Sequence, residues 1–371
     1  ETYAVRQAEF RFRRAFSALR EAGIVAVRAD AATAVALVEE GLAAARAAGS
    51  GPTLSGAILQ AGTVYAVLGA VAPARACFVE VLDLLGEQGE GSDWAAAITN
   101  LGAMDWLEGD YAAAETRFRE ARAAFRRAGD VRGEATAVHG LADVALVLGR
   151  PEARDLAEES LALYREMGDE AGTARGLETL GSAHLLAGDL DGAEPLLAES
   201  LDRRRRSGDR AGVALALLPA GDLHRTRGRP DAALVCYDEA RAIVAGLLDP
   251  VAVARVDVSR AGALLDAGGP TARDDAAGAL TAAAAVLVER PHPLVVAGYL
   301  GAAARLASAG GDADGAAWLA AASAAVRAGV GGRAARPWQP EAETATAGLA
   351  VDVTDITAVL ARTGEILAGS A

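Results

Sequence analysis

The chain of 371 residues contains no lysine, so all 36 of its basic residues are arginines. Walker A phosphate loops and Schiff-base chemistry both require a lysine, and the sequence therefore excludes these two kinds of site. With 50 acidic residues, the formal net charge is −14 at pH 7. Because this charge repels a phosphate backbone, we expect no direct binding of nucleic acid.

Aromatic residues are scarce too: they make up 4% of the chain, although hydrophobic residues make up 52%. Most apolar side chains are therefore Ala, Leu and Val, and a β-rich fold, which favours aromatic and β-branched residues, is not expected. Small apolar residues mixed with 23% charged residues are typical of helices that pack closely on one another.

Long apolar runs are missing as well. Even residues 276–288 fall short of the roughly 20 residues that a membrane helix requires, so we expect no membrane partner. The first 22 residues carry five Arg and three Glu, which is unlike a secretory signal. Only Cys77 and Cys236 are present, at equivalent repeat positions too far apart to form a disulfide, and we interpret both as core residues of a cytoplasmic protein.

Glycines recur with a period of about 40 residues in three interleaved series. The first series is Gly49, Gly89, Gly129, Gly168 and Gly208. The second is Gly69, Gly109, Gly149, Gly188, Gly228 and Gly268. The third is Gly62, Gly102, Ala142, Gly181, Gly221 and Gly262. Between them, apolar residues recur every three or four positions, which is the pattern of a helix face.

Each 40-residue unit is therefore predicted to be a pair of helices. The first series separates the units, often as Gly-Asp, because Gly ends a helix in the left-handed conformation and Asp suits the start of the next. The second series turns the chain within a unit. The third lies inside the first helix, where a Gly costs roughly 1 kcal/mol relative to Ala. We interpret it as the place where the two helices approach closely.

The expected organisation is a superhelix over residues 1–330, followed by a C-terminal cap or tail at 331–371. An irregular first pair would occupy 1–49, with helices near 3–21 and 31–48. Regular repeats would cover 53–247 as pairs at 53–89, 93–129, 131–168, 170–208 and 210–247. Degenerate repeats would cover 250–329 as pairs at 250–290 and 292–329. Stacking about eight such pairs predicts an all-α, right-handed α-solenoid with one concave face.

The pattern resembles the tetratricopeptide repeat in a 40-residue form. The best unit contains Asn100-Leu101-Gly102 and then Gly109-Asp110-Tyr111, Ala114, Phe118, Ala121 and Phe125. The segment LGAMDWLEGDYAAAETRFREARAAFRRAGD and the phrase AAWLAAA at 316–322 are similar to the C-terminal sensor region of large bacterial regulators of the LuxR, MalT and AfsR/SARP kind. In that group a DNA-binding domain and a STAND-type NTPase precede the repeats. The resemblance thus implies an upstream NTPase domain, and a chain that begins at Glu1 fits a part of such a protein.

One stripe of the first helices faces the concave surface in the resembling fold. A Trp beside mixed charges suits a groove for a peptide or a small-molecule effector. The alternative interpretation is a solvated inner face with one exposed Trp. The predicted partner- or effector-binding residues are Trp106, His139, Asp143, Arg175, Glu178, Ser182, Asp222 and Arg225.

No residue pattern points to catalysis. General acid–base pairs, HExxH and GxSxG motifs are missing, so we predict no catalytic residue, no metal site and no cofactor. His184 and His224 each follow a mid-helix Gly by three residues, and we interpret both as packing residues. The run Arg203 to Arg206 lies in the last turn of a helix, and we interpret it as a solvated helix end.

The sequence therefore predicts a protein- or effector-binding repeat domain that acts as the sensor of a transcriptional regulator. Its partner would be a protein, a peptide or a small molecule bound on the concave face. Two alternatives stay open, namely a stand-alone adaptor that joins two proteins and, less favoured, an enzyme built on a repeat scaffold. The sequence leaves the oligomeric state open.

Overall fold

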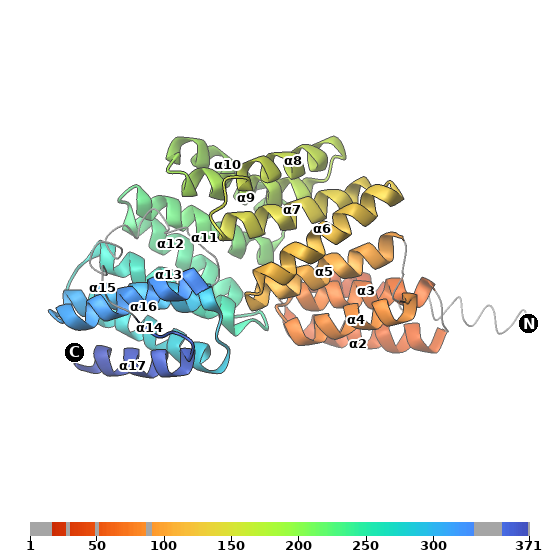
Figure 1. The fold of residues 1–371 in the computed structure, drawn as a ribbon. Coiled ribbons are helices and arrows are strands. Elements are labelled where there is room, and N and C mark those ends of the chain that lie inside the picture. Colours follow the sequence, from red (N-terminus) through yellow and green to blue (C-terminus); the bar gives the residue numbers. More distant parts are fainter. Residues whose placement is uncertain (1–16, 27–29, 49–51, 87–90, 330–350, 370–371) are drawn as a thin grey trace, which may run out of the picture.

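The computed structural model is all-α, with helices stacked into a superhelical α-solenoid (Figure 1). It describes residues 17–26, 30–48, 52–86, 91–329 and 351–369, and every regular element in these ranges is a helix. The predicted fold class is thus confirmed. None of the described helices is long and apolar enough to cross a membrane.

Residues 17–26 are helical and precede α2 (Ala31–Ala48). The chain then forms seven helix pairs joined by short turns. Their bounds are α3 (Pro52–Val67) with α4 (Val71–Leu85), α5 (Ser92–Glu108) with α6 (Tyr111–Ala128), α7 (Val131–Val147) with α8 (Ala153–Glu166), α9 (Glu170–Leu186) with α10 (Leu190–Ser207), α11 (Arg210–Thr226) with α12 (Pro230–Val244), α13 (Pro250–Ala267) with α14 (Ala272–Glu289), and α15 (Pro293–Ala309) with α16 (Ala313–Gly329).

Gly and Asp mark the turns as the first glycine series predicts. Gly129 and Gly208 end α6 and α10 in the left-handed region, with φ values of 70° and 72°. The next residues, Asp130 and Asp209, cap the following helices, since each side chain accepts a hydrogen bond from the backbone N–H three residues later. The repeat boundaries are therefore set by local backbone chemistry.

The glycines of the third series, except Gly262, lie where the two helices of a pair approach closely, as predicted; at Gly262 the nearest atoms belong to Arg225 of α11. A Cβ atom at Gly221 would lie 2.5 Å from the ring of Tyr237, and one at Gly181 would lie 2.8 Å from the side chain of Leu197. At Gly102 the nearest ring atom of Phe118 would be 3.0 Å away. Mid-helix glycine thus makes room for a large side chain of the second helix.

Ala142 shows how one unit accepts a methyl group at this position. It packs in a cluster with Ala157 and Leu161 of α8. Because Ala157 is small, no aromatic ring competes for the space beside Ala142. The exception therefore follows from a compensating small residue on the partner helix.

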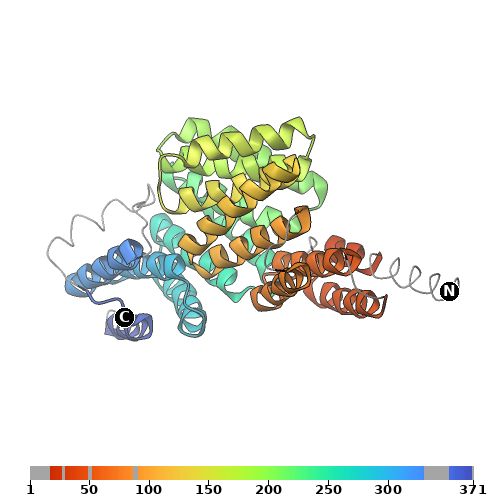
Figure 2. The same ribbon diagram turned by 45° about the vertical axis from the view of Figure 1, so that its right-hand side comes forward.

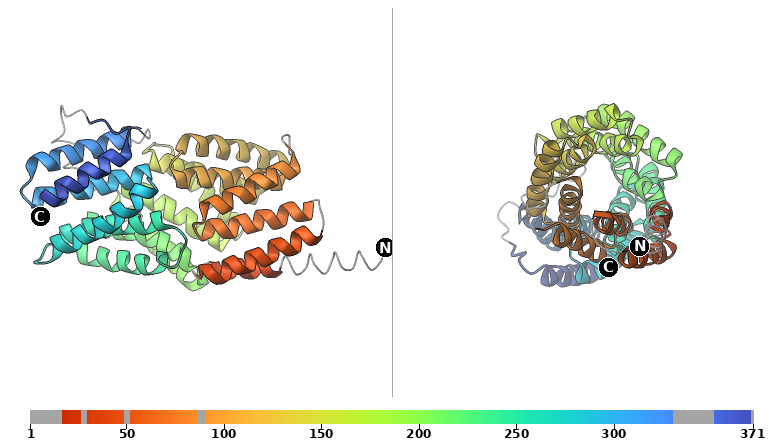
Figure 3. Two further views of the ribbon diagram at one scale, coloured as in Figure 1. Left: turned by 90° about the horizontal axis from the view of Figure 1, so that it is seen from below. Right: turned by 90° about the vertical axis from the view of Figure 1, so that its right-hand side faces the viewer.

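The first helix of each pair lies on the inner side of the superhelix. Neighbouring first helices contact each other all along the series, from α3 with α5 to α13 with α15, and no second helices in the described ranges make contacts of similar extent. Helices on the shorter, inner circumference are the ones that meet in this way. Viewed along its axis, the helices of the superhelix are arranged in a ring (Figure 3).

The superhelix curves enough for its two halves to touch. From the N-terminal pairs the chain rises to α7–α10 and descends to α13–α17 (Figure 2). The turn between α12 and α13 meets the turn between α3 and α4, where the Leu248 N–H donates a 2.8 Å hydrogen bond to the Leu68 carbonyl. A Cβ atom at Gly109, after α5, would lie 2.8 Å from Pro293 at the start of α15. These contacts join the N-terminal half of the ring to its C-terminal half.

The C-terminal pairs have an Ala-rich core, which α17 (Ile356–Gly369) covers by contacting α14, α15 and α16. On α17, the Arg362 guanidinium lies 4.2 Å from the ring centroid of Trp318 on α16. The degenerate repeats therefore still form regular pairs, because Ala can fill the space between two closely packed helices.

Candidate binding site

The predicted binding residues all lie on first helices, in the part of the ring formed by α5 to α11. Trp106 is on α5, His139 and Asp143 are on α7, Arg175, Glu178 and Ser182 are on α9, and Asp222 and Arg225 are on α11. Whether they bind a ligand stays a prediction. Their placement, however, separates six of them into three groups, and Trp106 and Ser182 stand apart from these.

The first group is an inner polar cluster of His139, Asp143, Tyr164, Arg175 and Thr179. His139 Nε2 lies 3.4 Å from Asp143 Oδ2, and the Thr179 hydroxyl donates a 2.9 Å hydrogen bond to Asp143 Oδ1. The rings of His139 and Tyr164 meet edge to face, with centroids 6.3 Å apart. Helices α7, α8 and α9 each contribute to this cluster, so the repeat packing itself positions it.

Burial shifts the pKa values of two groups in this cluster. Burial, with smaller effects from Arg175 and Arg204, lowers the pKa of His139 to about 3, so the imidazole is neutral at pH 7. Burial raises the pKa of Asp143 to about 6, although its hydrogen bond to Thr179 and the nearby Arg175 oppose the rise. The cluster therefore holds a neutral His beside a carboxyl group that gains a proton in mildly acidic solution.

Arg175 stands over the ring of Tyr164. Its Cζ lies 5.4 Å from the ring centroid, and its Nη2 lies 3.4 Å from the Tyr164 hydroxyl. Tyr164 is fully buried, whereas the Arg175 side chain is half-buried. A cation on an aromatic face that is itself buried is held in place by packing.

The second group pairs the inner helix α9 with the end of α10. Arg204 Nη2 donates a 2.7 Å hydrogen bond to Glu178 Oε2, and Arg204 Nη1 lies 3.5 Å from Asp209. Only 6% of the Arg204 side chain is exposed, so its interpretation as part of a solvated helix end is wrong. Arg204 continues the buried face that includes Leu197 and Ser200, at a spacing of three and four residues. That spacing is the signal that could have identified it.

The third group lies inside the packing of α11 to α15. Asp222 is buried and accepts a 2.6 Å hydrogen bond from the Tyr237 hydroxyl. The Arg225 side chain is 5% exposed and lies 2.8 Å from Asp266, which also pairs with Arg305. The structure therefore places Asp222 and Arg225 in a structural network, away from the open part of the inner face.

Trp106 and Ser182 complete the set. Trp106 is half-buried and packs against the cluster that contains Tyr111, Phe118 and Leu141. Its indole N–H is buried and has no hydrogen-bond partner among the described residues. Ser182 is half-buried on α9. Both are thus partly accessible, as a binding residue must be.

Sequence reasoning missed several residues near these groups. Burial raises the pKa of Glu178 on α9, and Arg204 and Arg255 oppose this rise. Arg255, on α13, also contributes to the lowered pKa of His292 beside α15, so its charge acts on both elements. Burial is the main cause of the His292 shift, to about 4. Leu215 is 45% exposed and occupies on α11 the position that Arg175 occupies on α9. No local sequence pattern marks Arg255 or His292, since their proximity depends on the curvature of the whole superhelix.

The cysteines and His184, which lie outside this region, take part in packing or in a contact at a helix end. Cys77 is buried in the α4 core, and burial raises its pKa to about 11, whereas Cys236 is half-buried. His184 Nδ1 lies 2.7 Å from Asp189, next to the α9–α10 turn. In the part of the chain that the structure describes, no three His, Cys, Asp or Glu side chains are placed to hold a metal ion.

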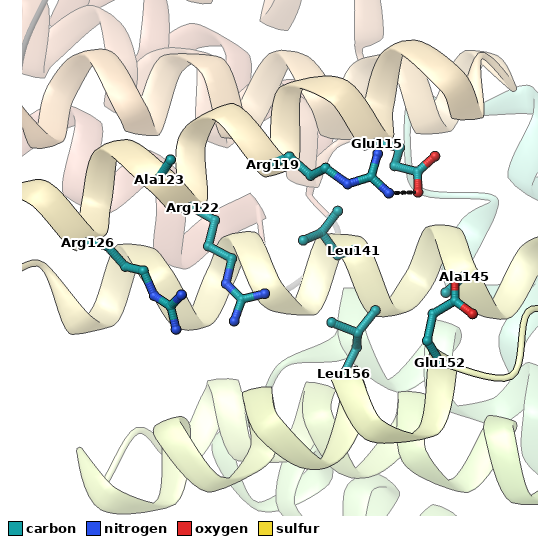
Figure 4. A pocket seen from close by; sticks show the side chains of 9 residues that line it. All are labelled: Glu115, Arg119, Arg122, Ala123, Arg126, Leu141, Ala145, Glu152 and Leu156. Carbon is teal, nitrogen blue, oxygen red and sulfur yellow. Dashed lines mark hydrogen bonds and ion pairs between the residues drawn. The ribbon is translucent and has the colours of Figure 1, made fainter.

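A cavity of about 350 Å³ lies between α6, α7 and α8. Arg119, Arg122 and Arg126 extend from α6 over Leu141 of α7, and Leu156 of α8 lies opposite (Figure 4). The arginines are neutralised by carboxylates, since Arg119 pairs with Glu115, Arg122 with Glu159, and Arg126 with Glu134. The walls of this cavity include two second helices, so it belongs to a different surface from the inner polar cluster.

The comparison with known families identifies the repeats. Residues 94–166, 133–206 and 172–245 each match the tetratricopeptide repeat model. The chain therefore contains tetratricopeptide repeats, and they include the helices that carry the inner polar cluster. A comparison with curated protein sequences gives no match.

Solved structures share the superhelix along most of the chain. A Rap protein in complex with Competence and Sporulation Factor aligns with 99% of this chain and 100% of its own, with a TM-score of 0.61 and 14% identity. The Rap conjugation gene regulator of plasmid pLS20, in complex with the Phr* peptide, aligns over 75% of each chain, with a TM-score of 0.59 and 14% identity. NprR with its cognate peptide NprX covers 72% of this chain and 77% of its own, with a TM-score of 0.50 and 11% identity. At these identities the likeness establishes the fold.

Proposed function

We propose that the chain is a peptide-binding regulatory domain, and that the peptide binds on the inner face at the inner polar cluster. The observation that carries the proposal is a half-buried, polar surface on the inner side of a closed ring. Three proteins of the same fold were solved with a bound factor or peptide. Tetratricopeptide repeats serve as binding scaffolds, and the proposal is accordingly binding without catalysis.

The chemistry of the inner face suits a short peptide. Arg175 and Asp143 offer groups of opposite charge, Ser182 offers a hydroxyl, and Leu215 offers an exposed apolar side chain. A peptide alternates backbone amides with side chains of different kinds, and such a mixed surface can satisfy both.

The regulatory step in this proposal is a change in the ring. Each pair contacts mainly its neighbours, so small changes at α7–α11 add up along the superhelix. The contact between Leu68 and Leu248 joins the two halves, and a ligand that prefers one curvature shifts the population of closed rings. In keeping with the resemblance to bacterial regulators, we propose that this change acts on a transcriptional regulator, through an NTPase domain in the same protein.

A steric block tests the proposal. Ser182→Trp would fill the inner face, whereas Val235→Trp would add the same bulk to α12, a second helix, at a side chain that is 68% exposed. The probe is a pool of random octapeptides, selected in solution by the full chain and identified by mass spectrometry. We expect Ser182→Trp to lower peptide recovery by at least about tenfold, a loss of about 1.4 kcal/mol, and Val235→Trp to leave it unchanged. Equal recovery by both variants, or no recovery by the parent chain, would contradict the proposal.

A further inference from the structure

Arg175 is a half-buried cation that forms no ion pair with any described residue. No carboxylate of the described residues lies within 4.0 Å of its guanidinium. Among the described residues, its one direct polar contact is the long hydrogen bond to the Tyr164 hydroxyl. Arg204 of α10 and Arg225 of α11 differ in this respect, because Arg204 pairs with Glu178, and Arg225 with Asp266.

Seven other described arginines that form no ion pair are exposed. The described residues of this kind are Arg20, Arg127, Arg165, Arg210, Arg229, Arg290 and Arg362. Water solvates an exposed guanidinium, so an exposed arginine needs no anion. A half-buried guanidinium loses part of that hydration, and an anion restores the lost interaction.

We infer that Arg175 binds a carboxylate group of the peptide, so that the ligand of the inner face is a peptide with a free C-terminus or an acidic side chain. This inference rests on the proposed function. The guanidinium presents a planar fork of N–H donors, which matches the two oxygens of a carboxylate. Packing of Arg175 on the buried Tyr164 ring fixes the direction of that fork before the ligand arrives.

The surroundings favour a singly charged carboxylate over a phosphate. Asp143 lies close enough for Arg175 to affect its pKa, and Glu178 lies one turn further along α9. These acidic groups repel a phosphate dianion more strongly than a carboxylate. Tyr164 is fully buried and its hydroxyl donates to Thr136, so Arg175 is the donor that the carboxylate would meet.

Three pools of random octapeptides distinguish the sources of the carboxylate. None of the pools contains Asp or Glu in its random positions. The first has a free C-terminal acid, the second has a C-terminal amide, and the third has a C-terminal amide and one Glu placed at each position in turn. Each pool is offered in solution to the full chain and to the variants Arg175→Gln, Arg175→Lys and Arg165→Gln. Arg165→Gln is the matched control, since Arg165 is an exposed arginine of α8 without an ion pair.

We expect the first or the third pool to be enriched about tenfold over the second, and the enriched pool identifies the source of the carboxylate. Arg175→Gln should abolish that enrichment, Arg175→Lys should retain part of it, and Arg165→Gln should leave it unchanged. Arg175→Lys keeps the charge, so it also separates a loss of binding from a loss of folding. Peptides that bind equally well from the amide pool, or to Arg175→Gln, would overturn this inference and leave the proposed function standing. Binding of no pool to the parent chain would overturn both.

Discussion

The backbone N–H of Leu248 donates a hydrogen bond to the carbonyl of Leu68, and this 2.8 Å contact joins the turn between α12 and α13 to the turn between α3 and α4. Gly69 lies beside it with φ of +75°. A Cβ atom on residue 69 would lie 2.2 Å from the Cβ of Asp249. The two turns therefore meet only because residue 69 has no side chain.

Replacing this glycine should open the ring. Gly69→Ala adds a methyl group that collides with Asp249, in addition to the roughly 1–2 kcal/mol cost of a left-handed non-glycine residue. Gly188→Ala is the matched control, because Gly188 has a similar φ of +78° and no atom within 4 Å of its Cβ position. Small-angle X-ray scattering should show a larger radius of gyration for Gly69→Ala alone, with the helix content of both variants unchanged. An equal radius for the two variants would show that the Leu68–Leu248 contact does not hold the ring closed.

The mid-helix glycines should differ in how they accept a methyl group. Ala improves helix propensity by about 1 kcal/mol, while overpacking costs about 1–3 kcal/mol. At Gly181 the neighbour is the flexible side chain of Leu197, so the two effects should nearly cancel in Gly181→Ala. At Gly221 the neighbour is the buried Tyr237, whose hydroxyl is bonded to Asp222, and Gly221→Ala should lose about 1–2 kcal/mol.

Urea unfolding of these two variants and of Gly181→Val measures the difference. The β-branched Val cannot fit beside Leu197, so Gly181→Val should also be clearly less stable than the parent chain. If Gly221→Ala is as stable as the parent chain, the close approach of α11 and α12 is not as the structure has it.

Two arginines of one run should differ sharply in their effect on stability. Arg204→Ala removes the partner of Glu178 from a buried pair, and the loss should be about 3–5 kcal/mol. Arg206 pairs with Asp202 at the surface, where their side chains are 70% and 58% exposed. Arg206→Ala should therefore cost no more than about 1 kcal/mol. Urea unfolding of both variants tests this prediction, and similar losses for the two would mean that Arg204 is solvated after all.

His292 should make the protein less stable in acid. Its pKa is lowered to about 4 in the folded chain and is about 6.5 in the unfolded chain. Between these values the unfolded chain binds a proton that the folded chain does not, so stability falls as the pH falls from 6.5 to 4. Asp143 acts in the opposite direction, because its raised pKa of about 6 makes the folded chain bind a proton first.

His292→Gln isolates the histidine contribution. Between pH 7 and pH 4 the stability of this variant, relative to the parent chain, should rise by about 2–3 kcal/mol. Urea unfolding at several pH values provides the measurement. A difference between the two proteins that stays constant over this range would show that burial does not perturb His292.

The helix pairs could be predicted from the sequence because their causes are local. Gly129 ends a helix and Asp130 starts the next through their own backbone and side-chain chemistry. Gly221 and Tyr237 meet within one unit, so their packing repeats with the sequence period. Three series of glycines at one period are sufficient evidence for such pairs.

The closure of the ring could not be predicted in the same way. Leu68 and Leu248 meet only after the small rotations between many pairs have been added, and no residue pattern records that sum. The inner-face stripe was predicted from register alone. In the structure, Arg175 is partly accessible, whereas Asp222 is buried in the core. The Tyr237 hydroxyl donates a hydrogen bond to Asp222 and holds it in the core, a contact that register alone does not predict.

Site-specific photo-crosslinking tests the central claim most directly. Benzoylphenylalanine is placed at Leu215 on the inner face in one variant and at Val235 on α12 in another, since both side chains are exposed. Each full-length variant is irradiated with the random octapeptide pool, and cross-linked peptides are counted by mass spectrometry. The account predicts peptide adducts at position 215 and none above background at position 235. Adducts at position 235 without adducts at position 215 would contradict binding on the inner face.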